Sequence, residues 1–518
     1  MGKFIMDWRL DLNSCPTRRH LLRGSAAAGV LLGLDGLGFL PRLPMVSAAE
    51  AALSPSLVRL DSSIEPLVAL LEDTPRERLL EEVAARIHKG TTYREVLTAL
   101  LLAGVRNVQP RPSVGFKFHA VLVVNSAHLA SLSSPDTDRW LPIFWALDYF
   151  KTAQARTQRE SGWRMAAVDE KRVPSAGKAG AALARAMEAW DEEAADAAAA
   201  GVARACTMEE AFELFARYGP RDFRDIGHKA IFVANSFRTL AAIGWQHGEP
   251  VLRSLAYALL KFEGDENPAT ANLAPDRPWR RNLERLEKIR PGWSDGKPDG
   301  AAVRTLLAAL RSCSEDEASA QVIELLNGGV APQSVWDAVL CGAAELMMRT
   351  PNIITLHSVT TANALRHAYA TSNDPRTRLM LMLQGASFLP LFRGATGRGR
   401  DVAIDAFEPI TTKAVGADAV TECFDDAGSD RMTAASKTLS YLSTGGDARR
   451  LIDHARRLVF LKGNDSHDYK FSSAVLEDHA HLSPAWRDRY LAASLFLLPS
   501  PSEPDNALVQ RTRAALTP

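Results

Sequence analysis

Apolar positions recur with helical spacing along most of the chain, and alternating strand-like segments are few. Residues 74–90, TPRERLLEEVAARIHKG, open on Thr-Pro, carry acidic residues early and basic residues late, and stop at Gly90. Residues 318–329, ASAQVIELLNGG, repeat this order and end on two glycines. The pattern predicts a mainly α-helical fold.

A third run, residues 181–205, is rich in alanine and predicts one further helical stretch, whose alanines we expect to face solvent. Proline, glycine and aspartate gather at residues 262–279 and 289–300, which predicts breaks between helices. Residues 392–401 predict a loop. Because no strand precedes that loop, its glycines do not form a phosphate-binding motif.

Segments far apart in the chain resemble one another at a nearly constant offset. Residues 118–132, FHAVLVVNSAHLASL, align with 356–370, LHSVTTANALRHAYA, which pairs His119 with His357 and Asn125 with Asn363. Three further segment pairs have an offset of about 239 residues, and one of them pairs His228 with His467. We therefore predict an internal duplication, with a first α-helical half at 55–290 packed against a second at 300–505.

The first 50 residues predict an export signal. Arg18 and Arg19 precede a weakly apolar, glycine-containing run and then small residues, with cleavage expected near Ala48 or Ala49. The pattern is that of a bacterial twin-arginine signal. It predicts a periplasmic or exported protein that meets the twin-arginine translocase during export and keeps no stable membrane anchor. Because this route carries folded proteins, it slightly favours a bound cofactor.

Charge and cysteine content exclude several functions. Lys plus Arg and Asp plus Glu both number 61, so no overall field favours nucleic acid. The five cysteines show no CxxC spacing and give no disulfide framework. Cys341 lies in an apolar run, which indicates a buried thiol rather than a nucleophile.

Four histidines, His119, His228, His357 and His467, lead the related segments. Imidazole is the commonest metal ligand and titrates near neutral pH, so these four are our candidate catalytic residues and metal ligands, with iron as the first choice. His367 lies ten residues after His357, about 15 Å along a helix, and cannot share its ion. Any ion therefore needs ligands from different segments, and the nearest carboxylates are Asp225, Asp468, Glu477 and Asp478.

Without a metal, the same histidines suit general acid–base chemistry on an aromatic or carbonyl substrate. Amides and hydroxyls could hold the resulting oxyanion. The candidate substrate-binding residues are Asn125, Asn235, Asn363, Thr360 and Trp245. Further aromatic and methionine residues could face a flat ligand: Phe116, Phe118, Trp145, Tyr149, Met347 and Met348. The alternative interpretation of all these residues is ordinary core packing and hydrogen bonding between helices.

Residues 356–370 resemble the questin oxidase-like family, through His357, Val359, Thr360, Ala364, Leu365 and Arg366. His119, His228 and His467 are the counterparts of further family histidines, and the resemblance extends diffusely over residues 60–500. Ser358 replaces the usual alanine, and the export signal is a second departure. The resemblance implies an α-helical oxidoreductase that opens a polyketide quinone ring by Baeyer–Villiger oxygenation, with NADPH as electron source.

We therefore expect an exported oxidoreductase or oxygenase that binds a small organic substrate, aromatic or quinone by resemblance, in a histidine-lined pocket between the two halves. The NADPH expectation comes from the resemblance alone, since the sequence has no GxGxxG motif after a strand. The alternative is a non-catalytic periplasmic helical binding or scaffold protein with structural histidines. A repeat of about 239 residues is far longer than that of a helical solenoid.

Overall fold

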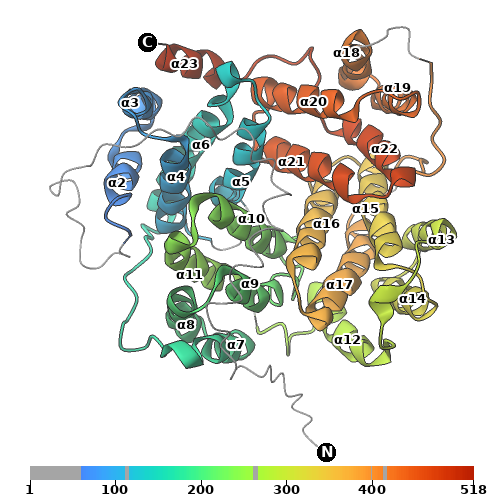
Figure 1. The fold of residues 1–518 in the computed structure, drawn as a ribbon, viewed down its shortest axis with the longest axis horizontal. Coiled ribbons are helices and arrows are strands. Elements are labelled where there is room, and N and C mark those ends of the chain that lie inside the picture. Colours follow the sequence, from blue (N-terminus) through green and yellow to red (C-terminus); the bar gives the residue numbers. More distant parts are fainter. Residues whose placement is uncertain (1–59, 111–115, 261–265, 398, 412–416, 518) are drawn as a thin grey trace, which may run out of the picture.

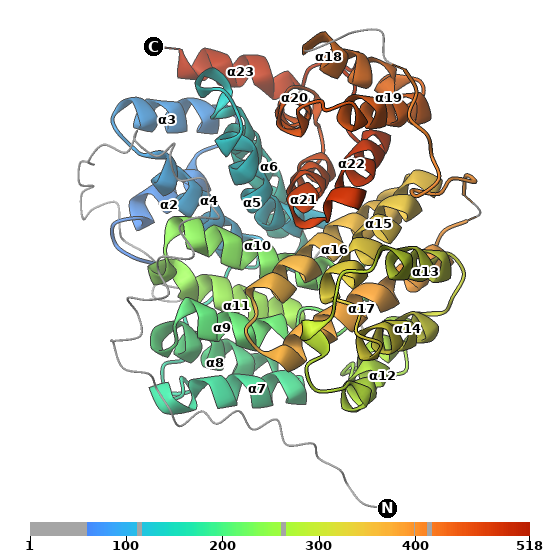
Figure 2. The ribbon, with the colours of Figure 1, turned by 45° about the vertical axis from the view of Figure 1, so that its right-hand side comes forward.

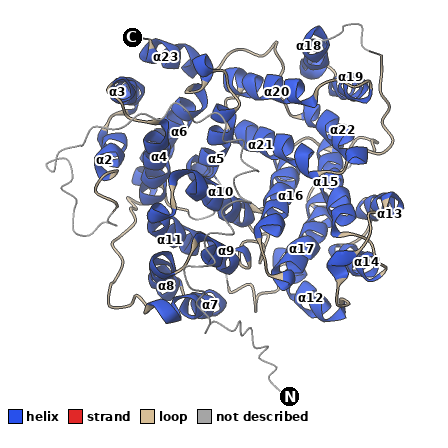
Figure 3. Cartoon of the chain, in the orientation of Figure 1, coloured by secondary structure: helices blue, strands red, loops and turns tan. Residues whose placement is uncertain are grey.

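The computed structural model describes residues 60–110, 116–260, 266–397, 399–411 and 417–517. Within these residues the chain forms 22 α-helices and no β-strand (Figure 3), which confirms the mainly α prediction. None of these helices is both long and apolar enough to cross a bilayer. The predicted export signal lies outside the described residues.

The helices of the first part of the chain are α2 (Glu65–Asp73), α3 (Arg76–His88), α4 (Tyr93–Asn107), α5 (His119–Leu132), α6 (Leu141–Glu160), α7 (Ala179–Ala189), α8 (Glu192–Ala205), α9 (Met208–Ala216), α10 (His228–Ile243), α11 (Gly248–Leu259) and α12 (Arg277–Arg285). Those of the second part are α13 (Gly300–Leu310), α14 (Glu315–Asn327), α15 (Pro332–Arg349), α16 (Ile353–Thr371), α17 (Pro375–Gly394), α18 (Ala417–Asp425), α19 (Arg431–Ser443), α20 (Ala448–Lys462), α21 (Ser466–His481), α22 (Pro484–Ala493) and α23 (Ala507–Leu516).

Four inner helices form a closed ring at the centre of the molecule (Figures 1 and 2). Helix α5 packs against α10 and α21, and α16 packs against the same two helices. The helices that the sequence pairs as equivalents, α5 with α16 and α10 with α21, therefore occupy opposite positions in the ring. The duplication itself stays a prediction.

Each inner helix is covered by two outer helices. Helices α4 and α6 pack on α5, α9 and α11 on α10, α15 and α17 on α16, and α20 and α22 on α21. Because this second layer removes the inner helices from water, even their polar side chains are buried over most of their length. Polar residues so enclosed need partners within the protein.

The prediction for residues 181–205 is wrong in two respects. The run is two helices, α7 and α8, because Trp190 adopts a left-handed conformation with φ of 59° and ends α7. Its alanine stretch, residues 197–200, is buried rather than solvated. Helix α8 packs between α7 and α11, and alanine side chains allow that close approach.

Candidate metal centre

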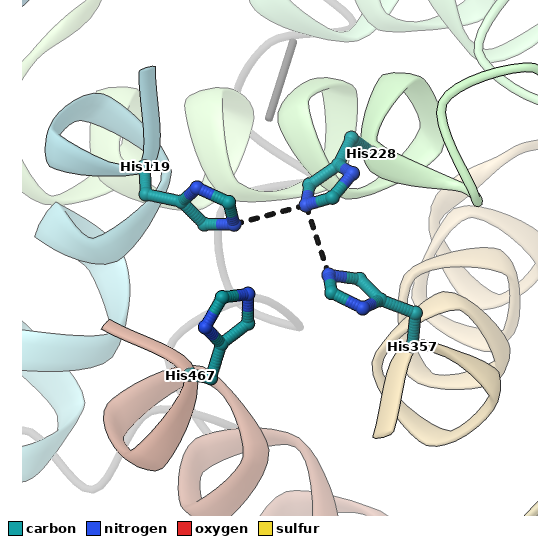
Figure 4. A group of neighbouring side chains, drawn as sticks. All are labelled: His119, His228, His357 and His467. Atoms are coloured by element: carbon teal, nitrogen blue, oxygen red, sulfur yellow. Dashed lines mark hydrogen bonds between the residues drawn. The ribbon is translucent and has the colours of Figure 1, made fainter. Parts of the chain in front are cut away.

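The ring of inner helices brings the four predicted histidines together (Figure 4). His119 and His228 are the first residues of α5 and α10, His467 is the second residue of α21, and His357 lies one turn into α16. One ring nitrogen from each lies within 4.8 Å of the other three. Two histidines come from each predicted half.

The Nε2 atoms of three of these rings point at one another. His228 Nε2 lies 3.0 Å from His119 Nε2 and 2.9 Å from His357 Nε2. On the far side of each ring, His228 Nδ1 lies 2.7 Å from the Asp225 carbonyl oxygen, and His357 Nδ1 lies 2.6 Å from the Ile353 carbonyl oxygen. A carbonyl only accepts, so Nδ1 carries the proton in both rings.

This tautomer leaves a lone pair on the Nε2 atoms that face the centre. Burial lowers the pKa of His228 and of His357 well below the ordinary value, and nearby cationic and imidazole groups, Lys470 among them, lower both further. Both imidazoles are therefore neutral at pH 7. Two neutral nitrogens with facing lone pairs repel each other unless a cation or a donor lies between them.

The fourth ring is oriented by a carboxylate. His467 Nδ1 donates to Asp465 Oδ1 at 2.6 Å, and this hydrogen bond lowers the pKa of Asp465 to about 2. Metal-binding histidines usually donate their second nitrogen to a carbonyl or a carboxylate in this way. Asp465 also caps the start of α21 by accepting from His467 N, so the same side chain fixes helix and ring.

A strained turn directly before α10 determines where the His228 side chain points. Ile226, which is β-branched, has a φ of 45°, and Gly227 has a φ of 88°. Thr361 on α16 donates to the Ile226 carbonyl at 3.3 Å, and a Cβ atom on Gly227 would lie 1.9 Å from Thr361 Oγ1. Only glycine fits between the two helices here, and backbone strain of this kind is concentrated at functional sites.

The four nitrogens fit a metal ion with open coordination positions. Two nitrogens at right angles on an ion about 2.1 Å away would be about 3.0 Å apart, whereas tetrahedral zinc would hold them about 3.3 Å apart. The observed 3.0 and 2.9 Å suit neighbouring ligands of one ion, and they are also ordinary hydrogen-bond distances. Ligands on opposite sides of an ion are about 4.2 Å apart, so a spread of 4.8 Å requires one ring to move by about half an ångström.

Lys470 touches the centre and was missed by the sequence analysis. Its Nζ lies 3.4 Å from both His228 Nε2 and His357 Nε2, and burial lowers its pKa to about 7. It lies three residues after His467, so both share one face of a helix. That spacing is the signal that could have identified it.

A narrow polar pocket continues from Lys470 inside the ring, with a free volume of about 10 Å³, room for about one water molecule. Four of the five predicted substrate-binding residues line it: Asn125, Asn235, Thr360 and Asn363. Arg238 and Glu477, which the sequence analysis did not assign to binding, line it too. These two residues are 239 positions apart, the offset of the predicted duplication, and they form an ion pair at 2.5 Å.

The structure does not bring the fifth predicted residue, Trp245, to this pocket. Trp245 lies beyond the C-terminal end of α10, where its indole donates to the Cys206 carbonyl at 3.1 Å. Among the described side chains, the aromatic and methionine candidates are also absent from the residues that line the pocket, and the side chain of Phe116 lies outside the described ones. Met347 and Met348 are fully buried in the core, Phe118 packs against Phe232, and Trp145 stacks on Tyr149 and Tyr469.

The four carboxylates considered as partners do not join the group of ligand atoms, which among the described residues consists of histidines alone. Asp225 contributes its backbone carbonyl, and Asp468 caps the turn before α21. Glu477 and Asp478 accept from the Asn363 amide, each at 2.9 Å, deeper in the ring. The carboxylate that does orient a ligand ring is Asp465.

Comparisons with known proteins yielded no match to this chain, whether among protein-family models, curated proteins or solved structures.

Proposed function

We propose that this protein is a metal-dependent oxidoreductase of the oxygenase type, exported by a bacterium, with iron held by His119, His228, His357 and His467. One observation carries the proposal: the Nε2 lone pairs of the buried, neutral His228 and His357 converge beside the His119 and His467 rings, and their protonated Nδ1 atoms are tied to carbonyls behind them. Without a metal ion, Lys470 Nζ, 3.4 Å from His228 Nε2 and from His357 Nε2, is a donor that these facing acceptors share; a metal ion would satisfy them at shorter distance.

Iron bound there would supply redox chemistry and positions at which dioxygen and an organic substrate could meet. The protein would contribute four imidazole ligands, the water-excluding second layer of helices and a small polar pocket that begins at Lys470. The resemblance to questin oxidase-like proteins supports the oxygenase class and NADPH as electron source. The polar pocket does not support a flat quinone as the substrate.

The test uses the full chain expressed with its own N-terminal segment and purified without added metal. Elemental analysis should find about one iron per chain. The His228→Ala and His357→Ala variants should lose the iron, whereas His88→Ala, at an exposed histidine on α3, should keep it. Circular dichroism of all three shows whether they remain folded.

Metal-free protein, or metal retained in folded His228→Ala, would contradict the proposal. Stoichiometric zinc with no redox-active metal would instead favour the scaffold interpretation with structural histidines. The export component is tested separately, by replacing Arg18 and Arg19 with lysine in the full chain. Accumulation of the variant in the cytoplasm, with wild-type protein in the periplasm, is the expected result.

A further inference from the structure

Lys470 differs from the other buried lysines in its partners. Four lysines are buried among the described residues. Three of them donate to a carboxylate or to backbone carbonyls: Lys117, Lys151 and Lys229. The Nζ atom of Lys470 instead lies 3.4 Å from two imidazole nitrogens, those of His228 and His357. A buried ammonium without a carboxylate is unfavourable unless the site itself uses its charge.

Without a metal ion, the Lys470 ammonium is the cation of the histidine centre. The Nε2 atoms of His228 and His357 are 2.9 Å apart, and both are unprotonated because Nδ1 carries the proton of each ring. An ammonium has three N–H donors, so Lys470 can donate to both nitrogens at once. The same two lone pairs would bind a metal ion. Lys470 and the ion are therefore alternative partners for one pair of nitrogens.

The positions of these atoms prevent both cations from being present together, a step that rests on the proposed metal centre. An ion about 2.1 Å from both nitrogens would lie at most about 4.6 Å from Lys470 Nζ, in whichever direction it binds. At that separation, in a site closed to water, an ammonium and a divalent ion repel each other strongly. The rings of His228 and His357 are neutral and do not offset this repulsion.

The polar pocket beside Lys470 offers a place to which the ammonium could move. Its free volume of about 10 Å³ has room for about one water molecule, and an ammonium group is of similar size. Side chains that carry oxygen acceptors line it, among them Asn125, Thr360 and Ser473. The four-carbon stem of lysine is flexible, so the ammonium can change partners while the backbone stays in α21.

We propose that Lys470 is an internal substitute for the metal ion: its ammonium occupies the centre when no metal is bound and withdraws into the pocket when a metal enters. The lysine thereby regulates metal binding at the proposed centre. It stabilises the metal-free protein and lowers its affinity for metal, so only an ion that binds imidazole strongly displaces it.

The experiment removes the charge of Lys470 in the full-length protein and measures two quantities. Competition with a chelator gives the affinity for Co²⁺, and urea unfolding gives the stability of the metal-free protein. Lys470→Met should raise Co²⁺ affinity at least tenfold and, at the same time, lower the free energy of unfolding of the metal-free protein. Replacing a lysine with a purely structural role would lower both quantities, and that result would overturn the inference.

Two further variants keep the test decisive. The amide of Lys470→Gln can still donate to an imidazole nitrogen but carries no charge. It should therefore fold even if Lys470→Met does not, and it should also bind Co²⁺ at least tenfold more tightly than the wild type. Lys462→Gln, in an ion pair with Asp505 at the end of α20, should match the wild type in Co²⁺ affinity. Equal Co²⁺ affinity in the wild type and Lys470→Gln would overturn the inference.

The proposed function can fail separately. If the wild type binds no Co²⁺ and Lys470→Gln binds one ion per chain, the inference is supported and the metal content proposed for the wild type is contradicted. If the wild type contains iron and Lys470→Gln gains no affinity, the metal centre stands and only the inference is overturned. Absence of metal from both proteins would overturn both.

Discussion

Helices α5 and α16 each carry two histidines in different environments. His119 and His357 face other imidazoles in the centre, whereas His128 and His367 lie about two and a half turns further along the same helices. His128 Nδ1 lies 3.0 Å from the Tyr93 hydroxyl, and His367 packs edge-on against the Phe212 ring. Helix geometry excluded His367 from the site in advance, and the nine-residue spacing from His119 places His128 on the opposite side of its helix.

Burial does not distinguish the two kinds of histidine. It lowers the pKa of His128 to about 4 and that of His367 to about 3, just as it lowers the pKa of His228 and His357. What differs is the atom opposite the unprotonated nitrogen. A hydroxyl faces His128. Another imidazole nitrogen faces His228, and the two rings can be satisfied by a shared metal ion or by the Lys470 ammonium, 3.4 Å from both.

The largest expected difference is in metal affinity, between a variant at a central histidine and a variant at a distal one. His228→Ala removes the ring that contacts both neighbours, so metal affinity should fall by more than the roughly 10–100-fold seen for outer-shell changes. His128→Ala should leave metal affinity unchanged within about twofold. Competition with a metal chelator measures the metal dissociation constant of each variant. Similar losses of metal affinity in the two variants would show that central and distal histidines do not differ in metal binding.

The strained turn before α10 should be intolerant of a methyl group. Gly227→Ala places a Cβ against Thr361 at a positive φ, and we expect a loss of about 3 kcal/mol in the free energy of unfolding, with weaker metal binding. Gly177→Ala is the matched control, because a Cβ there meets no atom within 4 Å. Urea unfolding compares the two, and equal stabilities would show that the turn is not strained.

The buried distal histidines should make the free energy of unfolding decrease in acid. His128 is protonated below about pH 6.5 in the unfolded chain, but burial lowers its pKa to about 4 in the folded chain. Neutral His128 therefore contributes to the free energy of unfolding above pH 6.5, and this contribution is lost as the pH falls from 6.5 to 4. His128→Gln should reduce the loss of unfolding free energy between about pH 7.5 and about pH 5 by about 2 kcal/mol. Urea titrations at both pH values measure it, and an unchanged loss would refute this assignment.

The smallest effect concerns the carboxylate behind His467. Asp465→Asn keeps an oxygen that accepts from His467 but removes its charge, so metal affinity should fall by about tenfold. Asp447→Asn is the control, because Asp447 caps α20 as Asp465 caps α21. If both variants retain wild-type affinity for the metal, Asp465 serves only as a helix cap.

Much of the candidate site could be predicted because its residues open related segments. Recurrence in related segments identified the four histidines, His119, His228, His357 and His467. Their places on the same helices identified four pocket residues, Asn125, Asn235, Asn363 and Thr360. Trp245 was grouped with them as a nearby aromatic, but α10 ends before it and carries it away from the ring. Lys470 and Arg238 were missed because lysine and arginine ordinarily indicate a solvated helix face, and Glu477 was considered as a metal partner but not as a lining residue of the pocket.

The sequence by itself determined the helical class, the breaks between helices and the four histidines, since these depend on local periodicity, caps and repeated segments. Only the tertiary structure decided that four helix starts meet at one point, that the alanines of α8 are buried, and that Arg238 reaches Glu477 inside a pocket. Those facts depend on which faces of distant helices are packed together. A helical period specifies which residues share a face, and only packing specifies what that face meets.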